Sequence, residues 1–284
     1  MERNCSGICM DKKKDRTMMM EKKVTIEAKD HVIPAILCIP EKNVKGAVVM
    51  LHGTGSQKNE VGNGYQTAAG ILAEKYQLAS IRFDFCGCGD SNGRHRDFNF
   101  TVAIEETLLA REYLKDQLKE NVKIGIMGWS QGGTLAMLAA ARYPELFSCI
   151  VTWAGATTLK NVILTDALYE EAKRNEYFVM QFPWRNPLEF GLSWCKDVRN
   201  TDVLKEISRY QGPVLAIAGT EDTIVPAENA KEIVRASSNQ FSEAYLIEGM
   251  DHTFHVFAEP ELKSLKIAID KTGRFFDEYL KISS

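Results

Sequence analysis

A serine between two glycines, where an apolar segment gives way to a helical one, constrains the fold of this chain most. The segment reads Lys123-Ile-Gly-Ile-Met-Gly128-Trp-Ser130-Gln-Gly132-Gly133, and its composition predicts a strand that turns into a helix over residues 131–143. The spacing Gly-x-Ser-x-Gly is that of a nucleophile elbow. Side chains at Gly128 and Gly132 would collide where strand and helix pass each other. The sharp turn exposes the Ser130 hydroxyl above the helix N-terminus, where negative charge would be stabilised.

A serine hydroxyl needs a base to act as a nucleophile at neutral pH, and that base needs an orienting carboxylate. In folds with such an elbow, the expected order along the chain is serine, acid, histidine. The histidines that follow Ser130 are His252 and His255. His252 comes just after a strand-like run, and loops after strands carry the chemistry in such sheets. We therefore expect His252 to be the base, with His255 as the alternative.

Asp222 is the candidate acid. It lies in a short loop between an apolar strand that ends at Gly219 and Pro226, a residue suited to the first position of the next helix. Glu221 is the alternative, although a solvated loop charge explains it as well. Ser130, Asp222 and His252 then follow in the expected order, each after a predicted strand.

The oxyanion of an acyl-transfer intermediate needs two backbone N–H donors. The residue after the nucleophile, Gln131, should supply one of them. The loop after the strand near Ala47–Leu51 should supply the other, through Thr54 in the run His52-Gly53-Thr54-Gly55. This loop lacks the spacing of phosphate-binding glycine motifs. We expect His52 to hold the loop through side-chain hydrogen bonds rather than to act as a second base.

Taken together, these segments resemble the α/β-hydrolase superfamily, and within it the bacterial cinnamoyl/feruloyl esterase-like group and its dienelactone-hydrolase-like relatives. The resemblance rests on five segments: residues 52–55, 82–91, 128–132, 219–226 and 251–254. It implies a serine carboxylester hydrolase with a catalytic triad, acting on short-chain or aromatic (cinnamoyl/feruloyl-type) esters. A small-molecule ester is then the expected substrate, and no cofactor is expected. In such folds Arg82 and Asp84 tie loops together.

Alternation of strands and helices predicts a mainly parallel sheet of about eight strands with helices on both faces. A hairpin over residues 23–39 is expected to join one edge. The predicted strands are 23–28, 32–39, 47–51, 79–84, 123–127, 149–153, 214–218 and 244–248. The predicted helices are 65–76, 99–117, 131–143, 203–208, 227–236 and 261–279. The fold class is therefore α/β, in the form of the α/β-hydrolase fold.

The segment 155–200 interrupts this alternation and is expected to be an inserted helical cap, because loops of such length are commonly lids. The core should then comprise residues 21–154 and 201–284, after a disordered lead over 1–20. The cap is rich in aromatic residues, and four rings are candidates to line a substrate pocket: Trp129, Phe178, Phe182 and Trp184. The cap rings could instead pack the cap onto the body or form a homodimer contact, and Trp129 could pack under the elbow.

Composition excludes several classes. A formal charge of −3 and a pI near 6.0 disfavour nucleic acid or an anionic membrane as the main partner. No apolar run is long enough to span a membrane. Seven scattered cysteines indicate reduced thiols and a cytoplasmic setting. Cys86 and Cys88 form a pair, but no second pair has zinc spacing, so no metal site is expected.

Two further activities stay open from the sequence. A peptidase resembling the prolyl-oligopeptidase catalytic domain would share every motif, although such proteins usually carry a large extra domain for which 284 residues leave no room. A thioesterase or acyltransferase would form the same acyl-enzyme and pass it to another acceptor.

Overall fold

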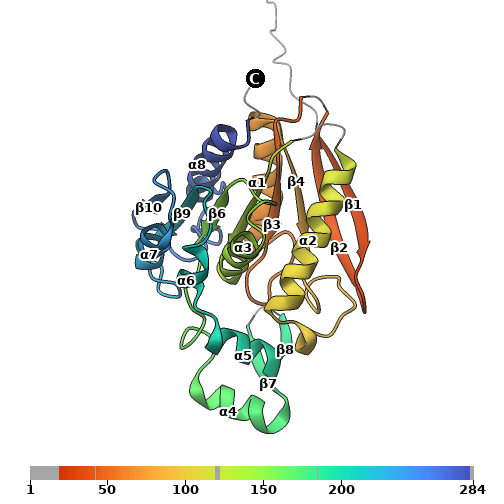
Figure 1. The fold of residues 1–284 in the computed structure, drawn as a ribbon, viewed down its shortest axis with the longest axis vertical. Coiled ribbons are helices and arrows are strands. Elements are labelled where there is room, and N and C mark those ends of the chain that lie inside the picture. The colour runs from red at the N-terminus through yellow and green to blue at the C-terminus, as the bar shows by residue number, and fades with distance from the viewer. Residues whose placement is uncertain (1–18, 42, 119–121, 184, 282–284) are drawn as a thin grey trace, which may run out of the picture.

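The computed structural model describes residues 19–41, 43–118, 122–183 and 185–281. It forms a central eight-stranded sheet with helices on both faces and an insertion at one end (Figure 1). The sheet strands are β1 (Met19–Glu27), β2 (Val32–Pro40), β3 (Gly46–Leu51), β4 (Leu78–Phe83), β5 (Ile124–Trp129), β6 (Ile150–Trp153), β9 (Val214–Gly219) and β10 (Glu243–Ile247). The eight predicted strands are confirmed, with bounds shifted by a few residues.

The strands lie in the order β1-β2-β4-β3-β5-β6-β9-β10. From β4 to β10 all neighbours pair in parallel, whereas β1 and β2 form the antiparallel hairpin expected at one edge. Because β1 begins at Met19, the last two residues of the predicted lead belong to a strand. The rest of that lead lies outside the described residues.

Helices cover the two faces of this sheet. They are α1 (Gly64–Tyr76), α2 (Phe100–Gln117), α3 (Gln131–Arg142), α6 (Val203–Ile207), α7 (Glu228–Ala236) and α8 (Lys263–Tyr279). The helices α1 and α8 pack on one face, and α2, α3, α6 and α7 on the other. Alternate side chains of β3 belong to the two hydrophobic cores on opposite faces of the sheet. Both faces of the strand are therefore buried, which explains why its sequence is continuously apolar.

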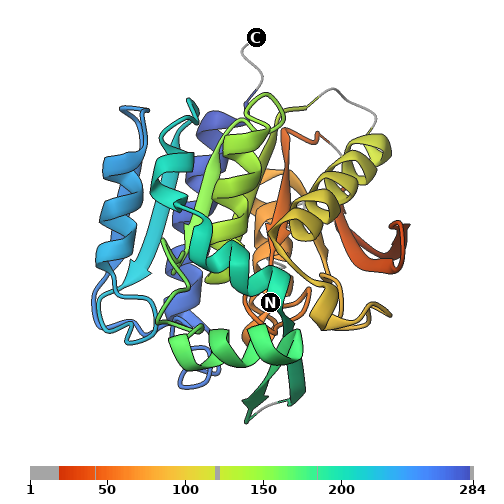
Figure 2. The ribbon, with the colours of Figure 1, turned by 60° about the horizontal axis from the view of Figure 1, so that its bottom comes forward.

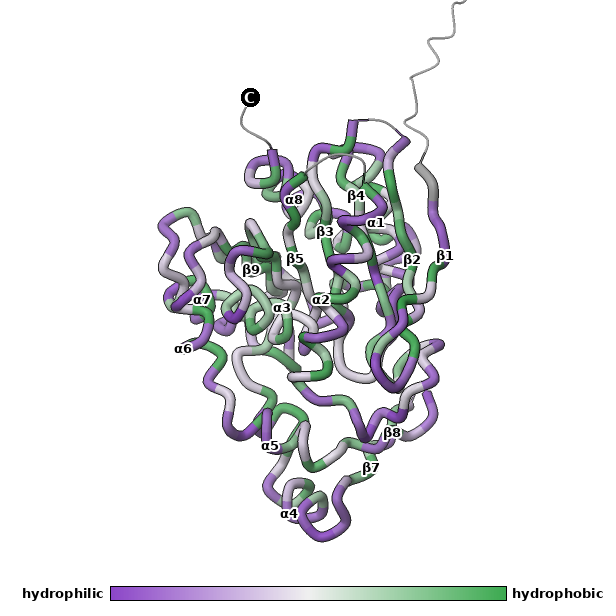
Figure 3. The backbone as a smooth tube through the Cα atoms, turned by 45° about the vertical axis from the view of Figure 1, so that its right-hand side comes forward, coloured by the Kyte–Doolittle hydropathy of each residue, from purple (hydrophilic) through white to green (hydrophobic). Residues whose placement is uncertain are grey.

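The insertion follows β6 and contains α4 (Asp166–Asn175), β7 (Tyr177–Phe182), β8 (Arg185–Gly191) and α5 (Leu192–Asn200). The strands β7 and β8 pair as an antiparallel hairpin, which the prediction of a helical cap did not include. Figure 2 brings the insertion to the front, and Figure 3 shows a largely hydrophilic outer turn around α4.

Two further observations concern membrane-spanning helices and the cysteines. No helix in the described part of the chain is long and apolar enough to cross a membrane. The five cysteines of the described residues form no disulfide, and their side chains are buried.

Candidate active site

Ser130 occupies the turn between β5 and α3 with φ 56° and ψ −122°, a strained conformation for a residue that has a side chain. The flanking glycines explain how the turn is accommodated. A Cβ atom on Gly128 would lie 2.0 Å from the carbonyl oxygen of Gly132, and one on Gly132 would lie 2.1 Å from that of Leu51. Only glycine fits at either position, so the backbone forms the expected elbow and leaves Ser130 partly exposed.

Asp222 and His252 meet in the loops that follow β9 and β10. The Nδ1 atom of His252 lies 2.7 Å from Oδ2 of Asp222, whose side chain is fully buried. The other oxygen, Oδ1, accepts hydrogen bonds at 2.8 Å from the backbone N–H groups of Ile224 and Val225. With both carboxylate oxygens occupied, Nδ1 carries the proton and donates it, which leaves Nε2 of His252 available as a base.

Trp129 links this pair to the elbow. Its indole Nε1–H donates to the carbonyl oxygen of His252 at 3.0 Å, and its ring packs on Phe254 with centroids 5.4 Å apart. Trp129 is 2% exposed, so the suggestion that it lines the substrate pocket is wrong, and it positions the His252 loop from below. No hydrogen bond joins Ser130 to His252 among the described residues, and such bonds often tighten only when substrate binds.

The two alternatives from the sequence lie elsewhere. His255 places Nδ1 3.7 Å from Oε1 of Glu259. The side chain of Glu221 is exposed, and its backbone N–H donates to Met250. The structure therefore brings together Asp222 and His252 rather than either alternative.

Thr54 lies in the loop after β3, which touches the elbow: a Cβ atom on Gly53 would lie 3.3 Å from that of Ser130. Among the described residues, the backbone N–H groups of Thr54 and Gln131 have no hydrogen-bond partner. The Thr54 hydroxyl is also buried without a partner there. Unpaired buried donors are costly, so this arrangement fits a ligand oxygen that completes their bonds.

Two buried side chains hold this loop. His52 contacts the Gly53 carbonyl oxygen through Nδ1 at 2.8 Å and accepts from the Phe85 N–H through Nε2 at 3.1 Å. Burial lowers its pKa, so it stays neutral, as its expected structural role requires. Glu60 accepts from the Gly53 N–H and, at 2.7 Å, from the Ser56 hydroxyl. The sequence did not single out Glu60, whose only signal is its place in the same loop.

Arg82 and Asp84 tie loops together as expected. Arg82 donates to Glu21 at 2.8 Å and to Asn59 at 2.9 Å. Asp84 forms a buried ion pair with Lys58 at 2.6 Å. Lys58 and Asn59 directly precede Glu60, so these contacts fix the part of the loop that carries it.

The insertion contacts the candidate oxyanion donors directly. Trp194 of α5 donates its Nε1–H to Oε1 of Gln131 at 3.0 Å. Arg185 of β8 donates to the carbonyl oxygen of Gly55. A Cβ atom on Gly55 would lie 3.2 Å from the Phe182 ring. The insertion is thus in contact with both loops that carry the N–H groups of Thr54 and Gln131.

The other predicted pocket rings differ in their surroundings. Phe178 is fully buried and stacks on Phe190 at 5.2 Å, and Phe190 packs on Trp194 at 4.7 Å. Phe178 therefore builds the core of the insertion, which corrects its placement in the pocket. Phe182, half-buried, faces the Gly55 loop. Trp184 lies outside the described residues.

We expect Trp194→Phe to raise KM and to lower the free energy of unfolding by about 1–3 kcal/mol, because Oε1 of Gln131 loses its buried donor. Ester kinetics and chemical denaturation measure the two effects. Trp153→Phe is the matched control, since it removes a buried indole bond to Thr272 on the α8 side of the sheet. That variant should lose stability with KM unchanged, and an equal change of KM in both variants would contradict a specific role of Trp194.

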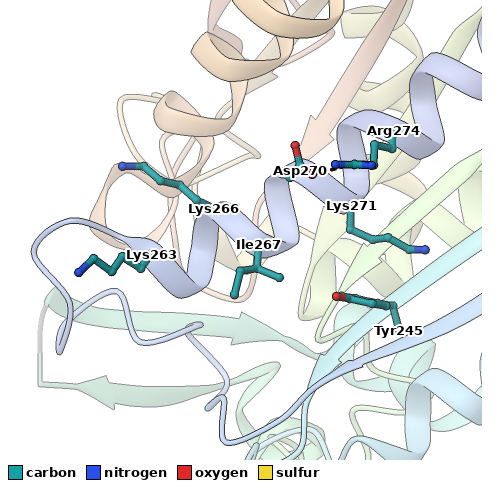
Figure 4. Close-up of a pocket in the computed structure, with 7 residues that line it drawn as sticks. All are labelled: Tyr245, Lys263, Lys266, Ile267, Asp270, Lys271 and Arg274. Carbon is teal, nitrogen blue, oxygen red and sulfur yellow. Dashed lines mark hydrogen bonds and ion pairs between the residues drawn. The ribbon is translucent and has the colours of Figure 1, made fainter.

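A hollow lies apart from these residues, on the outer side of α8 (Figure 4). It has a volume of about 570 Å³ and is lined by Tyr245 of β10 and six α8 residues: Lys263, Lys266, Ile267, Asp270, Lys271 and Arg274. Its charges are surface side chains, and Asp270 already pairs with Arg274 at 2.8 Å. None of its residues belongs to the Ser130 site.

Comparison with known proteins agrees with this fold. The human protein Serine hydrolase BPHL is 26% identical over 204 residues, covering 65% of this chain and 67% of that protein. Two solved structures share the fold: Est1E from Butyrivibrio proteoclasticus with bound ferulic acid, and dienelactone hydrolase from Anabaena variabilis. The first is 19% identical with a TM-score of 0.71, covering 90% of this chain and 98% of Est1E. The second is 18% identical with a TM-score of 0.63, covering 93% and 99%.

The resemblance to the α/β-hydrolase superfamily is therefore confirmed. The profile of the prolyl oligopeptidase family matches residues 99–283, which span the elbow, the insertion and the loops of Asp222 and His252. As this match extends over more than half of the sequence, the chain is a serine hydrolase of the α/β-hydrolase type and belongs to the prolyl oligopeptidase family.

Proposed function

We propose that the protein is a serine carboxylester hydrolase that acts through an acyl-enzyme on short-chain or aromatic esters. The observation that carries this proposal is the bond between Asp222 and His252. It is combined with a strained Ser130 and with N–H groups on Thr54 and Gln131 that have no hydrogen-bond partner within the part of the chain that the structure describes. These are the parts that acyl transfer by a serine requires: nucleophile, oriented base and oxyanion donors.

In the proposed reaction, Oγ of Ser130 attacks the ester carbonyl carbon while Nε2 of His252 takes the hydroxyl proton. The resulting imidazolium donates through Nδ1 to Asp222, which stabilises its charge. The carbonyl oxygen, now negative, accepts from the N–H groups of Thr54 and Gln131. The Nε2 proton then passes to the departing alkoxide, and the acyl group stays on Ser130. Water, activated by His252, releases the acid.

The proposed substrate class is supported by a structural neighbour and by an aromatic side chain near the candidate site. Est1E, whose structure contains ferulic acid, shares the fold of this chain, and this supports an aromatic acyl group here. Phe182 beside the Gly55 loop would offer such a group an apolar contact. A peptidase is the second candidate, because the matching family is named for oligopeptide hydrolysis.

A substrate panel tests this proposal. We expect the protein to cleave p-nitrophenyl esters of short acyl chains and methyl ferulate faster than an aminoacyl p-nitroanilide, measured as kcat/KM. A preference for the anilide would favour the peptidase. Acyl transfer to an added alcohol or thiol in excess of hydrolysis would favour an acyltransferase, and faster hydrolysis of a thioester than of the matching oxygen ester would favour a thioesterase.

A further inference from the structure

A second group of reactive side chains lies outside the Ser130 site. His31 precedes β2, Cys86 follows β4, and Glu106 lies in α2, so three distant segments supply one nitrogen, one sulfur and one carboxylate. Their donor atoms all lie within 4.8 Å of one another. Nε2 of His31 is 2.5 Å from Oε1 of Glu106.

These three groups are largely buried beside a hollow in the surface. Glu106 and Cys86 are 1% and 3% exposed, and His31 is half-buried. All three line a hollow of about 660 Å³. The cluster therefore lies at the wall of this hollow, next to space that a water molecule can occupy.

The charges around this hollow are mainly negative. Besides Glu106, it is lined by the carboxylates of Asp30, Asp97 and Glu105 and by the cations Lys29 and Arg94. Arg94 pairs with Asp97 at 2.8 Å. Four carboxylates against two cations leave an excess of negative charge, which favours a cation at this place.

We propose that His31, Cys86 and Glu106 bind a Zn²⁺-class divalent cation, with water from the hollow as fourth ligand. The mixed nitrogen, sulfur and oxygen set is one that Zn²⁺ accepts in tetrahedral sites. With a neutral imidazole, a thiolate and a carboxylate, the ligands balance the double charge of the ion, which lowers the cost of burying it.

The positions of the donor atoms suit this geometry. Tetrahedral zinc with bonds of about 2.0–2.3 Å sets its ligand atoms about 3.3–3.8 Å apart. The present separations, from 2.5 Å to at most 4.8 Å, bracket that range, so side-chain rotation brings the ligands into place. The backbone N–H of Cys86 donates to both oxygens of Glu106, at 3.1 and 3.3 Å, and so orients this carboxylate.

Binding releases protons. Nε2 of His31 must give up the proton that it shares with Glu106, and the Cys86 thiol must ionise. Glu106 raises the pKa of His31, while burial and then the nearby Glu106 carboxylate raise the pKa of Cys86 to about 12. We therefore expect the affinity to rise with pH.

Cobalt titration of the full chain, freed of metal with a chelator, tests this site. Co²⁺ replaces Zn²⁺ and gives a thiolate-to-cobalt charge-transfer absorption when sulfur is a ligand. We expect one Co²⁺ per chain, loss of this absorption in Cys86→Ser, and at least tenfold weaker binding in His31→Gln. Competing Zn²⁺ should displace the cobalt, and a pH indicator should report that protons are released as Zn²⁺ binds to the wild type.

Three matched variants exclude other binding places. Cys195→Ser removes another buried thiol, the double variant Cys5→Ser/Cys9→Ser removes two thiols near the N-terminus, and His252→Asn removes the Ser130-site histidine. All three should keep the absorption. Absence of the absorption in the wild type, its persistence in Cys86→Ser, or its loss in the double variant would overturn the proposal. Circular dichroism verifies that each variant is folded. The release of protons is measured on the wild type and therefore does not depend on the folding of any variant.

Discussion

In the Ser130→Ala variant, we expect kcat for the best ester to fall by about 10⁶-fold and the unfolding temperature to stay at the wild-type value. The loss is large because no other group can form the acyl-enzyme, and what remains comes from the oxyanion donors and substrate binding. The fold is unaffected because alanine keeps the Cβ atom and adds nothing to the strain at φ 56°. Steady-state kinetics and calorimetry measure the two quantities.

A serine elsewhere supplies the control for this variant. Ser193 of α5 is exposed, and Ser193→Ala should retain wild-type turnover. A serine-directed fluorophosphonate should label the wild type and Ser193→Ala but leave Ser130→Ala unlabelled. Full activity or full labelling of Ser130→Ala would contradict the assignment of the nucleophile.

In the Asp222→Asn variant, we expect kcat to fall by about 10⁴-fold with little change in stability. The amide oxygen can still accept from the N–H groups of Ile224 and Val225, so the loop keeps its shape. The amide nitrogen is a donor, however, and cannot accept the Nδ1 proton of His252. The imidazole is then driven to the tautomer with its proton on Nε2, which cannot take the Ser130 proton.

Glu221→Gln is the matched control for the acid, because Glu221 is the neighbouring carboxylate and its side chain is exposed. We expect its kinetics to stay close to wild type. A mild effect of Asp222→Asn together with a severe effect of Glu221→Gln would reverse the assignment.

Most of the fold could be predicted from local signals. Buried parallel strands such as β3 and β9 are short runs of apolar residues, and the turns that end them are marked by glycine. The hairpin of the insertion was missed because β8 contains Pro187, which argues against a strand. A two-stranded ribbon has free edges, so a residue without an N–H is tolerated there.

The candidate site likewise contains residues that local signals predict and contacts that depend on tertiary packing. Ser130, Asp222 and His252 could be proposed because each directly follows a strand, and the ends of parallel strands converge. The contact of Trp194 with Gln131 joins residues 63 positions apart and depends on how the insertion docks. No periodicity encodes that docking. The same holds for His31, Cys86 and Glu106, whose proximity follows from packing of α2 against the sheet edge.

The bond from the Trp129 indole to the His252 carbonyl has a mechanical consequence. Nucleophile and base are 122 positions apart in sequence and sit on separate loops, whose independent thermal displacements would add at the point of proton transfer. One short link from the residue beside Ser130 to the backbone of His252 makes both loops move together. The link therefore limits variation in the spacing of the two loops.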